Sequence, residues 1–509
     1  MAIGLVACAF ASVAAPRAEA APDFRPIPCP ADTFPEDADV DCGAIRVPEN
    51  RDRPGGRKIK VAAALVHAPS PTPNTPPIVF VTGGPGFGAI SGFALGAYFA
   101  DAAFIENRDL ILVDTRGTGI SRPRLGCPEI DEADVASYAK SYAGSQYTRT
   151  MARGIRACRD RLEARGIDLS AYTNAEAAAD LDALRRALGY ETWNLNAASA
   201  DGVLGLTYMR LFPDAIRSAI LDSPISNTNE ISLDFWLGMD ELLRKAFAGC
   251  AANPACDEKY PEIGKRFYRF LRKRNRHPKI ITLPRVPPDG VRIRVDGPEF
   301  FRFEGFLIFA GNLEAPESIS ALFDETWRAT HGKLAQVYRQ VFGTDPYTND
   351  YNDFFAQGRT LSERCHDSQN FITRRDREEA AEEVPVLAPF FLDPGAEMPV
   401  GGVGCKIWGV GRAPKVQIRP VESAIPTLIL TGEYDIAVPP LMSREIGDTL
   451  PNSFSYEIPA GAHLQLASFN FGAECSREIA GQFLDDPLTE PDSTCLGSIA
   501  PFDFTPPGP

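Results

Sequence analysis

Residues 192–209 read TWNLNAASADGVLGLTYM, and this stretch decides the fold. A short apolar run leads into one serine, Ser199, and a segment with apolar residues at helical spacing follows it. A strand that turns sharply into a helix exposes the serine hydroxyl and places the next backbone N–H, that of Ala200, at a helix N-terminus. The stretch therefore predicts a serine nucleophile, although the same pattern also fits a serine that only caps a helix.

A glycine-rich segment, VTGGPGFG at residues 81–88, follows another short apolar run. Adjacent glycines leave backbone N–H groups unobstructed, so Gly83 and Gly84 are candidate oxyanion donors together with Ala200. A plain turn is the alternative reading. A loop that binds nucleotide phosphates is disfavoured, because no Gly-Lys-Ser/Thr sequence follows the glycines.

Two segments near the C-terminus supply an acid and a base. Asp435 directly follows an apolar run in LTGEYDIAVPP (430–440), and His463 lies among small residues in IPAGAHLQL (458–466). The order Ser199, Asp435, His463 is that of the α/β-hydrolases and differs from the order in chymotrypsin and subtilisin. These stretches together predict Ser199 as nucleophile, His463 as general base and then acid, and Asp435 as the group that orients the histidine.

Strand-like segments alternate with helical ones along most of the chain, for example in residues 174–190. This alternation predicts an α/β-hydrolase fold, with a mostly parallel sheet and helices on both faces. The regular pattern stops after residue 224 and resumes near residue 425. We expect core segments at 21–224 and 421–509, a large inserted and mainly helical cap at 225–420, and a loose end after about residue 498.

The chain resembles the secreted tripeptidyl aminopeptidase and proline iminopeptidase branch of the α/β-hydrolases, from about Cys42 to Cys495. TGGPG at 82–86 matches H-G-G-P-G with Thr82 in place of the histidine, and DTRGTGIS at 114–121 matches D-x-R-G-x-G-x-S. The resemblance implies a serine hydrolase that removes residues or short peptides from free peptide N-termini through an acyl-enzyme. An esterase or amidase acting on small non-peptide substrates stays open, because the fold does not decide the substrate.

The residues around the serine depart from that branch. Its pattern G-x-S-Y-G becomes Ala197, Ala198, Ser199, Ala200, Asp201. A carboxylate at position 201 complements the helix dipole but opposes the charge of an oxyanion, and if buried it must be paired. A catalytically weakened binding protein is therefore a further alternative. Aminopeptidase action also needs an acid for the substrate's ammonium, and Glu433 and Asp201 are candidates because they lie close in sequence to the triad.

Composition limits the partners. The net charge is −15, with 67 acidic against 52 basic residues, which argues against nucleic-acid binding. Residues 1–20 combine an apolar stretch with AEA before Ala21, the pattern of a signal peptide, while LVAC (5–8) resembles a lipoprotein box with Cys8 as anchor. We therefore expect a secreted or periplasmic protein. No later apolar run reaches the roughly 18 residues of a stable membrane span.

The cysteines agree with export. Without Cys8, ten of the eleven cysteines remain, and they can form five local pairs, although sequence cannot fix the connectivity. No C-x-x-C pair occurs and none of the five histidines has the spacing of a ligand pair, so nothing indicates a metal or another cofactor. We expect a monomer whose partner is a peptide or a small acyl substrate. The local pairs are Cys29–Cys42, Cys127–Cys158, Cys250–Cys256, Cys365–Cys405 and Cys475–Cys495.

Overall fold

The computed structural model describes most of the chain between residues 22 and 506. The described ranges are 22–31, 33–36, 38–90, 98–100, 102–137, 145–228, 231–283, 291–298, 300, 323–333, 355–392 and 401–506. The predicted signal peptide, with the lipoprotein box at Cys8, lies outside these residues. Within them, no helix has both the length and the hydropathy that crossing a membrane requires.

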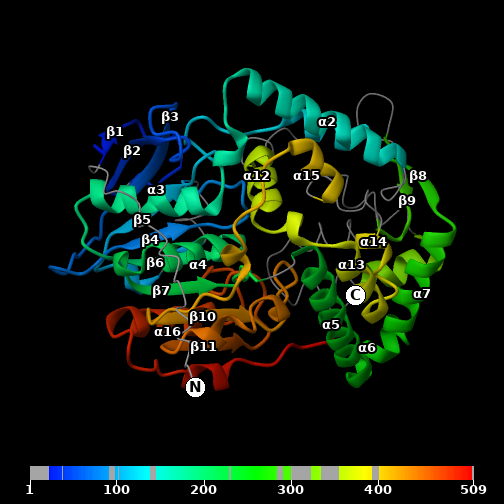
Figure 1. The fold of residues 1–509 in the computed structure, drawn as a ribbon. Coiled ribbons are helices and arrows are strands. Elements are labelled where there is room, and N and C mark those ends of the chain that lie inside the picture. Colours follow the sequence, from blue (N-terminus) through cyan, green and yellow to red (C-terminus); the bar gives the residue numbers. More distant parts are fainter. Residues whose placement is uncertain are drawn as a thin grey trace, which may run out of the picture.

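A nine-stranded sheet forms the core, in the order β1-β2-β3-β5-β4-β6-β7-β10-β11 (Figure 1). Pairing is antiparallel from β1 to β5 and parallel from β5 to β11, which confirms the predicted mostly parallel sheet. The strands are β1 Arg25–Pro26, β2 Val40–Pro48, β3 Lys58–Val66, β4 Ile78–Val81, β5 Leu110–Asp114, β6 Trp193–Ala198, β7 Ile216–Asp222, β10 Thr427–Gly432 and β11 Ser453–Ile458.

Helices cover both faces of this sheet. Along β4, Val79 and Val81 pack toward α3 (Asn174–Ala187) and α4 (Gly202–Leu211), whereas Ile78 and Phe80 pack on the face of α16 (Ala473–Asp485). Side chains of a strand alternate between the two faces, so a strand that is buried on both must be apolar throughout. That is why the central strands read as continuous apolar runs rather than as alternating patterns.

Between β7 and β10 the chain leaves the sheet and forms a mainly helical region (Figure 1, right). This region also contains a separate two-stranded antiparallel sheet of β8 and β9. Its elements are α5 Ile231–Ala252, α6 Pro254–Lys259, α7 Ile263–Arg276, β8 Lys279–Leu283, β9 Val291–Val295, α12 Gln357–Asp367, α13 Arg374–Glu383, α14 Pro389–Leu392 and α15 Gly402–Trp408.

The end of the chain is not the loose tail that the sequence suggested. Phe502 is 8% exposed and lies 5.0 Å from the ring of Tyr434, measured between ring centroids. Phe504 follows it into the aromatic cluster of the helical region and contacts the ring of Phe323. Two aromatic rings in a short segment bury enough apolar surface to hold it in place, so the tail ties the core to the helical region.

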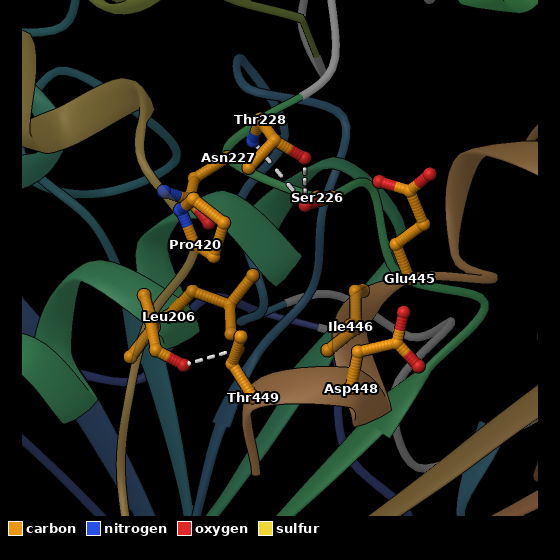
Figure 2. Close-up of a pocket in the computed structure, with 10 residues that line it drawn as sticks. Leu206, Ser226, Asn227, Thr228, Pro420, Glu445, Ile446, Asp448 and Thr449 are labelled. Atoms are coloured by element: carbon orange, nitrogen blue, oxygen red, sulfur yellow. Dashed lines mark hydrogen bonds between the residues drawn. The ribbon is translucent and has the colours of Figure 1, made fainter.

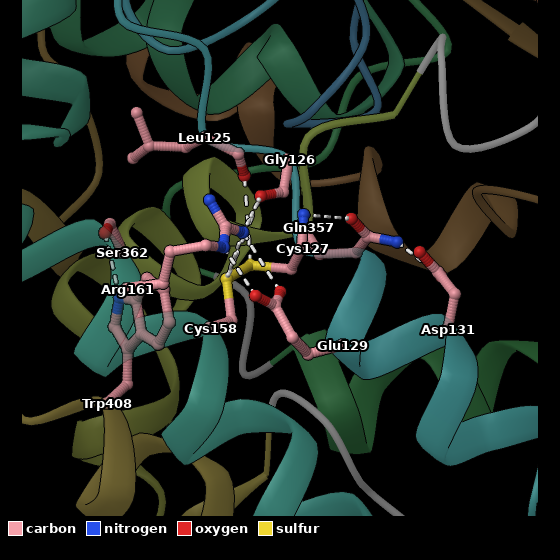
Figure 3. The surroundings of a disulfide bond; sticks show 10 residues. All are labelled: Leu125, Gly126, Cys127, Glu129, Asp131, Cys158, Arg161, Gln357, Ser362 and Trp408. Carbon is pink, nitrogen blue, oxygen red and sulfur yellow. Dashed lines mark hydrogen bonds and ion pairs between the residues drawn. A yellow bond between two sulfur atoms is a disulfide. The ribbon is translucent and has the colours of Figure 1, made fainter. Parts of the chain in front are cut away.

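All five local cysteine pairs are disulfides in the structure. Cys127–Cys158 joins α1 (Pro128–Val135) to α2 (Ser145–Ala164), and Gln357, the first residue of α12, packs beside it (Figure 3). The side-chain oxygen of Gln357 accepts the N–H of Cys127 at 3.2 Å. Cys365–Cys405 then ties α12 to α15, so α12 is held at both ends.

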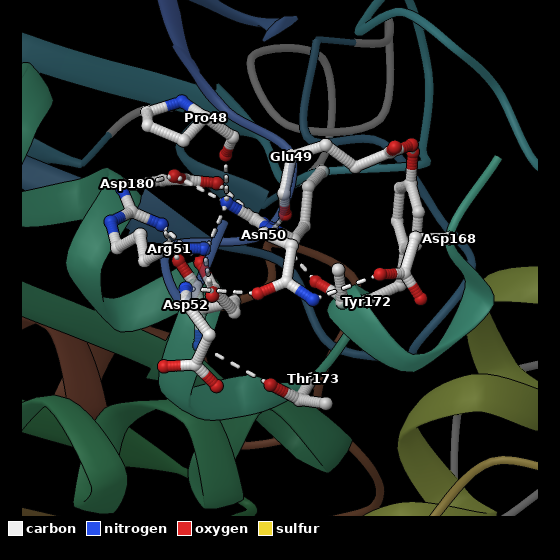
Figure 4. A network of polar contacts seen from close by, with 12 residues as sticks. Pro48, Glu49, Asn50, Arg51, Asp52, Asp168, Tyr172, Thr173 and Asp180 are labelled. Atoms are coloured by element: carbon white, nitrogen blue, oxygen red, sulfur yellow. Dashed lines mark hydrogen bonds and ion pairs between the residues drawn. The ribbon is translucent and has the colours of Figure 1, made fainter. Parts of the chain in front are cut away.

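The D-x-R-G-x-G-x-S segment has a structural role. Arg116 is fully buried, and its Nε and Nη2 each donate to the carboxylate of Asp180 at 2.7 Å. Its Nη1 donates to the carbonyl oxygens of Glu49 and Ala171, and Arg51 reaches the same Asp180 carboxylate (Figure 4). A bidentate pair with every donor used rigidifies the segment. The signature therefore fixes the loops on one side of the sheet.

Candidate active site

Ser199 occupies a sharp turn between β6, which ends at Ala198, and α4, which begins at Gly202. Its φ of 55° lies in the left-handed region, which a residue with a side chain rarely adopts. The Ser199 carbonyl accepts the N–H of Ile225 at 3.0 Å and so helps to hold the turn. A strained serine between a buried strand and a helix is the geometry of a nucleophile elbow.

The structure brings together the three predicted triad residues, which lie far apart in the sequence. Nε2 of His463 is 3.0 Å from Oγ of Ser199. On the other side of the ring, Nδ1 of His463 is 2.9 Å from Oδ2 and 3.1 Å from Oδ1 of Asp435. Each distance is within hydrogen-bond reach. The arrangement suits proton transfer from the hydroxyl to the imidazole, with the carboxylate holding the ring.

Asp435 is positioned by the turn that follows β10. It is 1% exposed, and its Oδ1 accepts the N–H groups of Ala437 at 3.0 Å and Val438 at 2.8 Å. Because the carboxyl ends of parallel strands meet at one edge of a sheet, Asp435 and Ser199 arrive at the same edge. The two backbone donors fix the carboxylate so that its other oxygen faces the histidine.

The loop that carries His463 is held by residues at the end of β7. Asp222 is fully buried and accepts the N–H groups of Gln465 at 2.7 Å and Leu466 at 3.1 Å. Oγ of Ser223 accepts the N–H of Leu464 at 3.0 Å. Three consecutive backbone groups after the histidine are thus fixed by two adjacent side chains, which sets the direction of the imidazole ring.

The pKa of His463 is raised above its ordinary value. Burial lowers this pKa, but the negative charge of Asp435 and its hydrogen bond to Nδ1 raise it, and the charge of Asp222 adds to the rise. A buried imidazole with two carboxylates near it favours the protonated form. The histidine is therefore well suited to hold the proton taken from a nucleophile.

Gly83 lies against the turn of Ser199. A Cβ on Gly83 would stand 2.4 Å from the carbonyl oxygen of Ala198 and 2.6 Å from Cβ of Ser199, so only glycine fits. Its φ of +83° also requires glycine. However, the Gly83 N–H donates to Oδ2 of Asp201 at 3.1 Å, so this predicted oxyanion donor is already engaged.

The other two predicted oxyanion donors differ from Gly83. Within the described part of the chain, neither the N–H of Gly84 nor that of Ala200 donates to a protein group. The N–H of Ala200 is free because the first N–H groups of a helix have no acceptor within that helix. Gly84, with φ +43°, adjoins the serine turn through Gly83. Of the three N–H groups predicted to bind an oxyanion, only those of Gly84 and Ala200 therefore remain as candidates.

Neither carboxylate predicted to bind a substrate amine is free in this structure. Glu433 forms an ion pair with Nζ of Lys245 at 2.7 Å and accepts the N–H of Ala460 at 2.8 Å. Asp201 is only 4% exposed and holds Gly83. An acid that is already neutralised or buried attracts a ligand cation weakly, so the geometry favours neither residue as an amine site.

The glycine that the family pattern places two residues after the serine has substitutes further along α4. A Cβ on Gly202 would lie 2.7 Å from Cβ of Pro224, and a Cβ on Gly205 would lie 2.7 Å from Cβ of Ala197. These two glycines permit the close approach of α4 to the sheet. The side chain of Asp201 is therefore accommodated without displacing the helix.

The sequence interpretation missed Asp222 as a residue of the site. Its signal was present, since Asp222 ends the apolar run SAILD just as Asp435 follows the apolar run before it. It also missed Arg359 of α12, which lies close enough to Asp201 to shift its pKa. No local pattern marks that arginine, because the contact joins residues from distant parts of the chain.

A cavity of about 170 Å³ lies beside α4, between Leu206, the segment that follows β7 and the segment around Ile446 (Figure 2). Ser226 and Thr228 hydrogen bond to each other at its rim. None of the triad residues lines it, so it is separate from the site around Ser199. Among the described residues, no cluster of three or more His, Cys, Asp or Glu side chains could hold a metal ion.

Comparisons with known proteins agree with this geometry. The alpha/beta hydrolase fold family matches residues 76–276, and the family described as TAP-like protein matches residues 389–495. Serine protease Hip1 of Mycobacterium tuberculosis is 25% identical over 451 residues, which cover 81% of this chain and 79% of Hip1.

Two shorter matches are to proteins named for different activities. Tripeptidyl aminopeptidase of Streptomyces lividans is 28% identical over 198 residues, which cover 38% of this chain and 36% of that protein. Carboxylesterase B of Mycobacterium tuberculosis is 30% identical over 227 residues, which cover 42% of each chain. Taken with the sheet order and the serine turn, the matches show that this chain is a serine hydrolase with the α/β-hydrolase fold and a TAP-like C-terminal part.

Proposed function

We propose that this protein is a secreted aminopeptidase that releases N-terminal residues or short peptides through an acyl-enzyme on Ser199. The observation that carries the proposal is the hydrogen-bonded series Ser199–His463–Asp435, with distances of 3.0 and 2.9 Å. A peptidase is favoured over other hydrolases by the similarity to Hip1, which extends over most of both chains. The tripeptidyl aminopeptidase match supports action at the N-terminus.

The proposed chemistry has two steps. In the first, Oγ of Ser199 attacks the scissile carbonyl carbon while Nε2 of His463 takes the hydroxyl proton. The imidazolium then gives this proton to the leaving amine, and the carbon–nitrogen bond breaks. In the second step, water donates a proton to His463 and attacks the acyl-enzyme, which releases the acid and restores Ser199. Asp435 keeps the imidazole ring in place through its bond to Nδ1.

The oxyanion of each tetrahedral intermediate needs two donors. The N–H groups of Gly84 and Ala200 are the candidates. Ala200 directly follows Ser199, Gly84 directly follows the Gly83 that lies against the serine turn, and neither N–H has a protein acceptor in the described residues. Fixed donors stabilise the charge that develops on the carbonyl oxygen, and loss of one such donor typically slows catalysis by about 10²–10³-fold. The hydrogen-bonded triad supports catalysis over a role in binding alone.

A substrate panel tests the proposal. Aminoacyl, prolyl and tripeptidyl nitroanilides are compared with p-nitrophenyl esters, and each peptide is also supplied with an acetylated N-terminus as its matched control. An aminopeptidase cleaves the free peptides and not the acetylated ones. Equal cleavage of free and acetylated peptides, or turnover of esters alone, contradicts the aminopeptidase proposal.

An esterase or amidase is the second candidate function. The observation in its favour is the similarity to carboxylesterase B over 42% of each chain. The triad serves ester and amide hydrolysis equally, so the decision rests on the substrate pocket. This function predicts turnover of short-chain esters with kcat/KM at least tenfold above that of every free peptide in the same panel.

Secretion belongs to the proposal as well. Five disulfides support an oxidising compartment, because such bonds are rare where glutathione keeps thiols reduced. Expression of the full chain in a bacterium, followed by N-terminal sequencing of the exported form, should find Ala21 as the first residue. Retention of residues 1–20 in a cytosolic product contradicts this.

A further inference from the structure

Asp201 stands two residues after Ser199 and is almost completely buried, at 4% exposure. Its Oδ2 accepts the N–H of Gly83 at 3.1 Å. Gly83 itself touches the serine turn, since a Cβ there would lie 2.6 Å from Cβ of Ser199. The carboxylate therefore joins the first turn after the nucleophile to the glycine loop, which consists of residues 82–88.

The buried carboxylate has counter-charges on α12. The pKa of Asp201 is raised, because burial raises it by more than the positive charges of Arg359 and Arg364 and the bond from Gly83 lower it. The pKa of Glu363 in the same cluster is raised to about 7, because burial outweighs the charges of the two arginines. A buried carboxylate persists beside a reacting centre only when such charges compensate it.

Arg359 is rigidly placed. It is fully buried, its Nη1 donates to the carbonyl oxygen of Tyr172 at 3.0 Å, and the same atom pairs with Glu363 at 2.7 Å. Its Nη2 lies 3.3 Å from Oδ1 of Asn174. The guanidinium is thus anchored to the end of the loop before α3 and to the first residue of that helix.

The segment before α12 contacts the glycine loop directly. The N–H of Ala356 donates to the carbonyl oxygen of Gly86 at 2.9 Å, and the ring of Phe355 lies 5.1 Å from that of Phe87. One end of the loop is therefore held by the residues leading into α12. The other end is held by Asp201, through the bond from the Gly83 N–H.

We propose that Asp201 is a positioning residue of the acyl-transfer site: its carboxylate fixes the Gly83 peptide and leaves the N–H groups of Gly84 and Ala200 as the oxyanion donors. This rests on the proposed function of Ser199. It goes beyond that function because it gives a role in catalysis to Asp201, which stands where the family pattern has a glycine. Asp201 acts through the loop and does not touch the substrate.

Two substitutions distinguish the hydrogen-bond acceptor at position 201 from the negative charge of the carboxylate. Asp201→Asn keeps an oxygen that can accept the Gly83 N–H, and Asp201→Ala removes it. Asp240→Asn is the matched control, since Asp240 of α5 is also a buried carboxylate, 6% exposed and paired with Arg244, but it lies in the helical region. The readouts are the second-order rate of fluorophosphonate labelling, and kcat and KM on the best substrate of the panel.

The proposal predicts a specific order of rates. Asp201→Ala loses about tenfold or more in labelling rate and in kcat, with KM changed by less than about threefold, because fixed oxyanion donors act in the transition state. Asp201→Asn and the Asp240→Asn control stay within about threefold of the parent. Labelling by Asp201→Ala as fast as by the parent overturns the proposal, and so does an Asp201→Asn variant as slow as Asp201→Ala.

Circular dichroism and thermal melting establish that each variant is folded before its rate is compared.

A measurement independent of activity separates failure of this proposal from failure of the proposed function. Amide hydrogen exchange is followed by mass spectrometry in a peptide covering residues 82–88. Exchange should rise in Asp201→Ala and stay near the parent rate in Asp201→Asn. Unchanged exchange in Asp201→Ala overturns the inference even if the enzyme is active. If exchange rises in Asp201→Ala as expected, but the parent is neither labelled nor active on any substrate, only the proposed function is contradicted.

Discussion

At the scale of single residues, Ser199 illustrates how the site stores strain. Its left-handed backbone, with φ 55°, costs roughly 1–2 kcal/mol for a residue with a Cβ. The cost is tolerated because β6 and α4 hold the residues on both sides and the Ile225 N–H fixes its carbonyl. Strain of this kind keeps the hydroxyl exposed toward the histidine.

The strain makes a prediction about stability. The free energy of unfolding should be about 1 kcal/mol higher for Ser199→Gly than for Ser199→Ala, because glycine adopts a positive φ freely. Both variants lack the hydroxyl, so they differ only in the Cβ. Denaturant unfolding of the two proteins side by side measures the difference. An alanine variant equal to or more stable than the glycine variant would show that the turn is not strained.

The raised pKa of His463 predicts a pH dependence. The imidazole must be neutral to take the serine proton, so kcat/KM should rise with pH and its acid limb should lie above 6.5, the ordinary value. Asp222 contributes to the raised pKa, so Asp222→Asn should move that limb to lower pH. The variant is compared with Asp240→Asn over the full pH range. A limb that stays in place refutes the role of Asp222.

The raised pKa of His463 also sets how the stability of the fold depends on pH. The folded-state pKa of His463 exceeds the unfolded value, so its protonation stabilises the fold below the unfolded pKa. This contribution is lost as the pH rises through the folded pKa. Activity and this part of the stability therefore change in opposite directions across that interval.

At the scale of elements, the packing of α4 on β6 sets the position of the nucleophile. Gly205 allows this packing, since a Cβ there would lie 2.7 Å from Cβ of Ala197. An added methyl must push the helix away from the strand that carries Ser199. Overpacking of this kind typically costs about 1–3 kcal/mol.

Gly205→Ala should therefore destabilise the protein by about 1–3 kcal/mol and lower kcat, although alanine is the better helix former. Gly481→Ala in α16 is the matched control, because the nearest atom to its added Cβ is 3.8 Å away. There the gain in helix propensity should stabilise the fold by about 0.5–1 kcal/mol. Thermal unfolding of both variants measures these changes. If both variants were stabilised, or both destabilised, this account of the elbow would be contradicted.

The strands and helices around Ser199 also explain how much of the fold and of the candidate site the sequence could predict. The mostly parallel sheet, and the positions of Ser199 and Asp435 after buried strands, were predictable because an apolar run followed by a polar residue is a local pattern. The engagement of Gly83 by Asp201 was not, because it depends on which way one side chain points.

At the scale of the whole molecule, α12 links the helical region to the glycine loop, since the N–H of Ala356, the residue before this helix, donates to Gly86. Cys365–Cys405 ties it to α15, with a sequence separation of 40 residues. In the chain-entropy picture, closing a loop of that length stabilises the fold by about 4 kcal/mol. The disulfide therefore contributes both to stability and to the position of the helix that carries Arg359.

Replacing both Cys365 and Cys405 by serine should lower the melting temperature and reduce kcat, because α12 loses one of its two anchors. The control is the double serine variant of Cys29 and Cys42, whose bond spans 13 residues near the edge of the sheet. That variant should also melt earlier but keep its kcat. Loss of activity in the control and not in the α12 variant would contradict the proposed link.

The most direct test of the central claim is covalent labelling of the catalytic serine. The full-length protein is incubated with a fluorophosphonate probe, and the labelled peptide is identified by mass spectrometry in the parent, Ser199→Ala and His463→Ala. The account predicts one labelled residue in the parent, Ser199, no labelling of Ser199→Ala, and labelling of His463→Ala slowed by at least about 10³-fold. Labelling that survives Ser199→Ala, or a folded parent that never labels, would contradict it.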